Sequence, residues 1–147
     1  MGQSEGNTER RHLQRFPALE LEAQMKPQKR VLGPWTDIEA FDFTRTGLSI
    51  ATPQTLAPDD VVMLRLRLPL ATGDLTAERL VAVVRNVQPQ PDHTFRYGVE
   101  FDFGASRHMK RMATSACLGR IEGILDRSEK LRNRLMSQQE LLKSLES

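Results

Sequence analysis

The feature that most constrains the fold is a strict alternation of apolar and polar residues in short segments bounded by turns. The clearest case is segment 61–68, whose alternate apolar positions are Val62, Leu64, Leu66 and Leu68. Successive side chains of a strand point to opposite faces, so a period of two marks a strand with one buried and one wet face. The sequence therefore predicts a sheet that covers a core with one face.

Segments of this kind recur along the first two thirds of the chain, with proline, glycine and aspartate between them. The expected strands cover residues 19–25, 31–43, 48–52, 61–68, 78–87 and 93–103. Six short strands at turn-marked intervals are typical of a small antiparallel barrel or sandwich. Closure removes exposed strand edges, so we expect a six-stranded antiparallel β-barrel in a mainly β fold.

From about Ala105 the strand pattern ends and a long C-terminal helix is expected. Steps of four and three residues, the heptad spacing of a coiled coil, connect Cys117, Ile121, Ile124, Ser128, Leu131, Leu135, Gln138, Leu142 and Leu145. Such a stripe needs a partner surface. We expect one part to pack on the barrel and the later part to meet another helix, either in a homo-oligomer or in a partner protein.

Composition limits the kinds of ligand and the compartment. The formal charge of the 147-residue chain is only +2, so a small anion fits better than a nucleic-acid polymer. Cys117 is the only cysteine, which excludes an intramolecular disulfide and agrees with a reducing compartment. No apolar run is long enough to span a membrane. We therefore expect a cytoplasmic protein, with Cys117 as a buried packing residue.

Patterns for catalysis are missing from the sequence. His12, His93 and His108 lack the spacing of metal ligands. No nucleophile elbow, phosphate loop or pair of catalytic carboxylates is apparent. We expect no catalytic residues, no metal and no cofactor, and we interpret the chain as a binding protein.

Two short stretches carry the binding hypothesis. Arg10, Arg11 and Arg15 precede the first strand, and a guanidinium group can pair with phosphate, bind the O6/N7 edge of guanine or stack on a base. The turn at 42–47 offers the carboxylate of Asp42, the hydroxyl of Thr44 and a glycine. Taken singly, each has an ordinary explanation: a solvated charge run for the arginines, and local backbone hydrogen bonds for the turn.

Together these stretches resemble the PilZ domain family over about residues 9–105. The family pattern is Arg-x-x-x-Arg, often with one more arginine, followed by Asp or Asn-x-Ser-x-x-Gly. The matching residues are Arg10, Arg11, Arg15, Asp42 and Gly47. Thr44 stands where the family usually has serine, and Thr46 where it often has glycine. The stretches 83–85 and 98–101 are similar to the family's later strands.

The resemblance implies a six-stranded barrel that binds the second messenger cyclic di-GMP on its outer surface. The expected organisation is a flexible tail at 1–9, a barrel domain with an arginine switch segment at 10–105, and a C-terminal helix at 106–147. The implied ligand-binding residues are Arg10, Arg11, Arg15, Asp42, Thr44 and Gly47. Ordering of the arginine segment would relay the messenger to a protein effector that controls motility, pili, biofilm or exopolysaccharide.

Two alternatives remain open at this point. A barrel of this type could have lost the nucleotide and act as an adaptor through its helix. A single-stranded nucleic-acid binder is the other, since small barrels can stack bases on aromatic side chains. Trp35 would be its platform, although this residue is better interpreted as part of the core or rim of the barrel.

Overall fold

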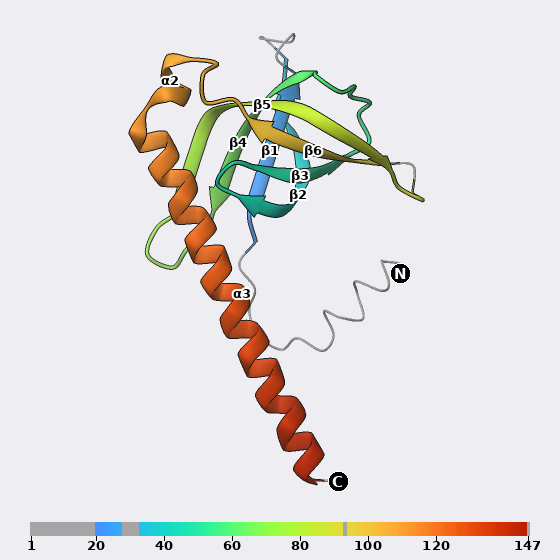
Figure 1. The fold of residues 1–147 in the computed structure, drawn as a ribbon, viewed down its shortest axis with the longest axis vertical. Helices are drawn as coiled ribbons and strands as arrows, with labels where there is room; N and C mark the ends of the chain where they lie inside the picture. Colours follow the sequence, from blue (N-terminus) through green and yellow to red (C-terminus); the bar gives the residue numbers. More distant parts are fainter. Residues whose placement is uncertain (1–19, 28–32, 93, 147) are drawn as a thin grey trace. The chain divides into compact units, whose positions relative to one another are not determined.

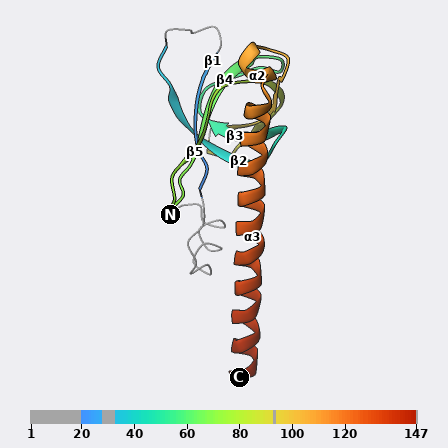
Figure 2. The same cartoon turned by 90° about the vertical axis from the view of Figure 1, so that its left-hand side faces the viewer.

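The computed structural model describes residues 20–27, 33–92 and 94–146. Its strands are β1 Glu22–Pro27, β2 Thr36–Thr44, β3 Gly47–Thr52, β4 Val61–Leu68, β5 Leu75–Pro89 and β6 Phe95–Phe101 (Figure 1). All neighbouring strands are antiparallel, and the order β1-β2-β3-β6-β5-β4 closes because β1 also pairs with β4. Figure 2 shows β1 beside β4. The predicted closed six-stranded antiparallel barrel with a long C-terminal helix is confirmed.

The barrel interior is filled by the apolar positions of the alternating pattern. In β4, the side chains of Val62, Leu64, Leu66 and Leu68 are at most 2% exposed, as the period of two predicts. The other strands contribute fully buried side chains, namely those of Met25, Ile50, Leu80, Val84 and Tyr97. The Tyr97 hydroxyl donates to the carbonyl of Gln54 and accepts from the N–H of Leu56, both at 2.8 Å. A buried phenol is therefore fully hydrogen-bonded.

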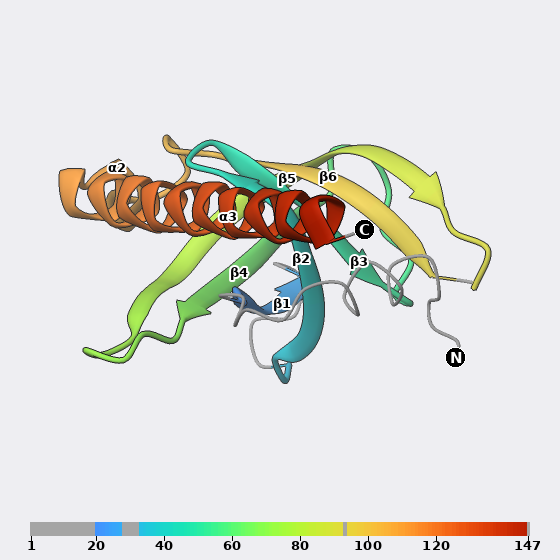
Figure 3. The same ribbon diagram turned by 90° about the horizontal axis from the view of Figure 1, so that it is seen from below.

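Strand boundaries differ from the expected ones where pairing decides them. β2 begins at Thr36. Residues 33–35, which were predicted to belong to this strand, form no strand. β5 extends beyond the predicted 78–87 at both ends, since its first part pairs with β4 and its last part pairs with β6 (Figure 3). Register shifts opposite Arg65 and at Arg85 interrupt both ladders. Such bulges bend a strand, which allows one long strand to serve two neighbours around a barrel.

Two helices follow the last strand, as expected from about residue 105. They are α2 Arg107–Lys110 and α3 Met112–Glu146. The Ser106 hydroxyl caps α2 by accepting from the N–H of Met109 at 3.1 Å. Met109 is fully buried, and its sulfur lies 3.4 Å from the Val81 nitrogen of β5. The short helix α2 thus packs against the barrel beside β5 through the side chain of Met109.

The first part of α3, residues 112–122, packs within the same compact unit as the barrel, which spans residues 20–122. Leu118 and Ile121 are fully buried there. Cys117 is only half-buried, so its predicted role as a buried packing residue holds in part. Its sulfur lies 3.4 Å from the carbonyl oxygen of Thr76 in β5. Burial raises the pKa of the Cys117 thiol, which keeps it protonated.

The rest of α3, residues 123–146, belongs to a second unit. Four of its large apolar side chains are exposed, namely Leu131, Leu141, Leu142 and Leu145, whereas Ile124, Leu125, Leu135 and Met136 are half-buried. Within the described residues, neither helix combines the length and the apolar character that crossing a membrane requires.

Candidate functional site

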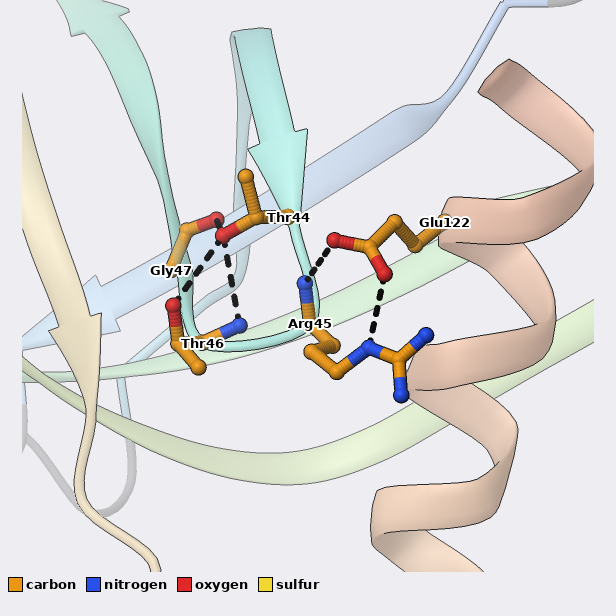
Figure 4. Close-up of polar contacts among 5 residues, drawn as sticks. All are labelled: Thr44, Arg45, Thr46, Gly47 and Glu122. Carbon is orange, nitrogen blue, oxygen red and sulfur yellow. Dashed lines mark hydrogen bonds and ion pairs between the residues drawn. The ribbon is translucent and has the colours of Figure 1, made fainter.

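The predicted turn is a two-residue hairpin between β2 and β3. Thr44 pairs with Gly47, and Arg45 and Thr46 form the turn. The Thr44 hydroxyl donates to the Gly47 carbonyl at 3.2 Å and accepts from the Thr46 N–H at 3.3 Å, as Figure 4 shows. It also lies 3.1 Å from the Thr46 hydroxyl. The local explanation of Thr44 is therefore confirmed: its hydroxyl closes the turn.

Gly47 is needed because another strand passes very close to it. Gly47 pairs with Glu100 of β6, and a Cβ atom at Gly47 would overlap the carbonyl oxygen of Val99. It would also lie 3.2 Å from the Cα of Glu100. A glycine in such a turn can be required by a positive φ or by the close approach of another part of the backbone. Close approach is the reason here.

The positive φ of the motif belongs to Asp42, at 51°. Phe41 pairs with Ser49 and Thr44 pairs with Gly47, so two residues of β2 stand opposite Leu48 alone. This is a β-bulge, and bulges re-aim side chains. Aspartate tolerates the left-handed conformation better than most residues. The bulge explains why the consecutive residues Phe41 and Asp42 both contact the same neighbour.

That neighbour is Arg96 of β6. Its Nη2 lies 2.8 Å from Oδ2 of Asp42, and its Cζ lies 4.3 Å from the centroid of the Phe41 ring. The Asp42 side chain is 76% exposed, whereas that of Arg96 is 33% exposed. The hairpin's own backbone is thus not the partner of this carboxylate. An exposed pair of this kind contributes at most about 1 kcal/mol, so a ligand can displace it at small cost.

Sequence reasoning missed Arg96. Alternation in β6 places Tyr97, Val99 and Phe101 inside, which implies that Arg96 points outward. This signal gives the face of the barrel but not the neighbour, because β6 reaches β2 only across β3. Asp42 and Arg96 are 54 residues apart in the chain.

A second missed contact connects the turn to α3. Arg45 donates from Nε to Oε1 of Glu122 at 2.6 Å, and from its main-chain N–H to Oε2 at 3.1 Å (Figure 4). One carboxylate therefore holds both the side chain and the backbone of a turn residue. Both carboxylate oxygens of Glu122 are used, so the two hydrogen bonds form together only when the turn has this geometry.

Not all predicted site residues can be placed. Asp42, Thr44 and Gly47 meet in one hairpin, while Arg10, Arg11 and Arg15 lie outside the described residues. Trp35 is half-buried before β2, with Nζ of Lys26 at 5.0 Å and Cζ of Arg65 at 4.5 Å from its ring centroid. Trp35 is thus a rim residue rather than part of the core, and its ring already contacts the side-chain cations of Lys26 and Arg65.

Chemically, the hairpin surface offers an acceptor next to a donor. The Asp42 carboxylate can accept from N–H groups, and the Arg96 guanidinium can donate to oxygens or stack on a planar ring. In the described part of the chain, no group of three or more His, Cys, Asp or Glu side chains is arranged to hold a metal ion. No family model matches the chain, and no curated protein matches it.

Proposed function

We propose that this protein is a cytoplasmic, non-enzymatic receptor for cyclic di-GMP, with the dinucleotide bound on the outer barrel surface at the β2–β3 hairpin. Arg10, Arg11 and Arg15 bind guanine edges, base faces and phosphates, and Asp42 accepts from a guanine N–H. Thr44 and Gly47 form the floor of this site. Binding orders the arginine segment and alters the contacts of the protein with an effector in motility, pilus, biofilm or exopolysaccharide control.

The observation that carries the proposal is the exposed Asp42 carboxylate beside Arg96 on the outer face of a closed barrel. Guanine carries N–H donors on one edge and the O6 and N7 acceptors on another, so it matches an adjacent carboxylate and guanidinium. The spacing of Arg11, Arg15, Asp42 and Gly47, which resembles the PilZ pattern, adds independent support.

A route for the relay is supported by the contact between the turn and α3. Arg45 lies between Thr44 and Gly47, and its guanidinium and N–H are both bound by Glu122. A ligand that shifts the turn must strain or break these two hydrogen bonds. The bound and free states then differ at Glu122, which is part of the helix that carries the heptad stripe.

The alternative function is an adaptor without a nucleotide. One observation favours it: Asp42 is already paired with Arg96, and the Thr44 hydroxyl is used within the turn. In that case the hairpin is a structural element, and the helix alone mediates the interactions of the protein.

Isothermal titration calorimetry of the full chain with cyclic di-GMP tests the proposal. We expect measurable binding, which Asp42→Asn weakens. Asparagine tolerates the positive φ of this position, and it removes the charge and replaces one acceptor oxygen with an NH2 donor. Losing a hydrogen bond to a charged group costs about 1.5–3 kcal/mol, which is roughly a 10- to 100-fold rise in Kd. Arg11→Ala and Arg15→Ala should weaken binding in the same range.

Matched controls separate the site from general charge effects. Asp37→Asn makes the same change at an exposed carboxylate of β2 that binds Gln24. Arg107→Ala removes an exposed arginine at the start of α2. Both should leave Kd unchanged. Absence of heat at high micromolar protein, or equal effects of control and site variants, would favour the adaptor.

A further inference from the structure

The distal part of α3 carries a coiled-coil seam in which three leucines are exposed and Leu135 is half-buried. With Leu135 and Leu142 at heptad position a, Leu131 and Leu145 fall at position d. The exposed fractions of Leu131, Leu142 and Leu145 are 52%, 59% and 75%. Leucines in this register normally insert between the side chains of a facing helix. The seam is narrow, since it consists of these two positions with few flanking apolar residues.

Charges flank this seam in an asymmetric way. Arg127 and Arg134 fall at position g and Arg132 at position e, the positions that border a partner helix. The acidic residues Asp126, Glu129 and Glu140 fall at positions f and b, on the side away from the seam, and only the last residue of α3, Glu146, falls at position e. Both borders of the seam between residues 127 and 134 are therefore positive.

The border arginines also lack counter-charges within the helix. Across the described residues, Arg127, Arg132 and Arg134 take part in no ion pair, whereas Lys130 pairs with Asp126 at 3.2 Å. The Nε of Arg132 is buried without a hydrogen-bond partner. The guanidinium groups of the exposed Arg127 and Arg134 are thus available to carboxylates of a facing helix, and the half-buried Arg132 lies on the other border.

A second copy of the chain offers only one carboxylate at a border position, that of Glu146 at position e. In a parallel, in-register pair, position g faces position e of the next heptad, so Arg127 meets Arg132 of the other copy. In an antiparallel pair, position g faces position g, which holds arginines and Leu141 in this segment. Position e faces position e, where Arg132 can meet Glu146 of the other copy in one register only. Like charges opposite each other destabilise pairing.

We propose that the face of residues 124–145 docks an amphipathic helix of another protein, with leucine-type residues in its seam and acidic residues at its borders. A membrane surface fits less well, because interfacial helices use a broad apolar face with aromatic residues. This seam is narrow, contains Ser128 and Gln138, and has no aromatic residue within α3. The inference does not depend on cyclic di-GMP.

Fluorescence anisotropy with two synthetic peptides tests the docking face. Both peptides are roughly four heptads long, with leucine at positions a and d. One carries glutamate at e and g, and the other carries lysine. Titrated with the full chain and no dinucleotide, the acidic peptide should bind at least about tenfold more tightly, since three border pairs change from attraction to repulsion.

Two variants make the result specific. A triple variant with Arg127→Glu, Arg132→Glu and Arg134→Glu should reverse the preference and bind the basic peptide more tightly. Replacing Leu131→Ser and Leu142→Ser should abolish binding of both peptides, while the unfolding transition of the barrel stays unchanged because both leucines are exposed.

Three results would overturn the proposal. Sedimentation equilibrium could show that the chain forms a dimer more tightly than it binds the acidic peptide. The two peptides could bind equally or not at all. The chain could bind vesicles that contain phosphatidylglycerol more tightly than it binds the acidic peptide. In that case Leu131→Ser and Leu142→Ser would abolish the binding to vesicles.

Discussion

The two parts of α3 share one heptad pattern but differ in what covers it. In residues 112–122, Leu118 and Ile121 are fully buried in the unit that contains the barrel. In residues 123–146, Leu131, Leu142 and Leu145 of the same register are more than half exposed, whereas Leu135 is half-buried. A heptad pattern thus predicts which face of a helix is apolar, but it does not predict whether the same chain covers that face. The first part is buried in the unit that contains the barrel, whereas the second part leaves Leu131, Leu142 and Leu145 exposed.

The largest expected contrast is between two truncations at position a of the heptad. Ile121→Ala removes a fully buried side chain and should lower the free energy of unfolding by about 2–5 kcal/mol. Leu142→Ala, at an exposed site, should change it by less than about 0.5 kcal/mol. Urea denaturation of both variants measures the difference. A comparable loss in Leu142→Ala would mean that the distal leucines are covered in the isolated chain.

A pair of glycine substitutions gives the next largest contrast. Gly47→Ala places a methyl group against the backbone of Val99, so we expect a loss of about 1–3 kcal/mol. Gly123→Ala meets only the flexible Arg127 guanidinium, at 3.3 Å, and should stabilise the helix by up to about 1 kcal/mol. Thermal unfolding should therefore shift in opposite directions. An unchanged midpoint in Gly47→Ala would show that β3 and β6 can separate at little cost.

The smallest expected effect concerns two ion pairs, one in each unit. A double-mutant cycle on Arg45 and Glu122 should give a coupling of roughly 0.2–1 kcal/mol, because the Arg45 side chain is 63% exposed. The i,i+4 pair of Asp126 and Lys130 should give about 0.3–0.5 kcal/mol. Both cycles are measured by denaturation at low and high salt. Zero coupling would mean that the Arg45 side chain contributes nothing to the connection between the turn and the helix, and would leave only its main-chain hydrogen bond to Glu122.

The local pattern was sufficient for most of the barrel. Alternation in β4 predicted both its bounds and its buried face, because period and burial are properties of consecutive residues. The turn at 42–47 was also recognised from its own residues. What the pattern could not give was the bulge at Asp42, since a register shift depends on the partner strand.

By itself, the sequence determined the number and faces of the strands, the hairpin that presents Asp42, and the apolar stripe of the C-terminal helix. Only the tertiary structure decided that Arg96 pairs with Asp42 and that Glu122 holds Arg45, across 54 and 77 residues of chain. It also decided that the stripe is buried at Ile121 and exposed at Leu142. The physical reason is that periodicity fixes the direction of a side chain relative to its own backbone, whereas its neighbour depends on the closure of the barrel.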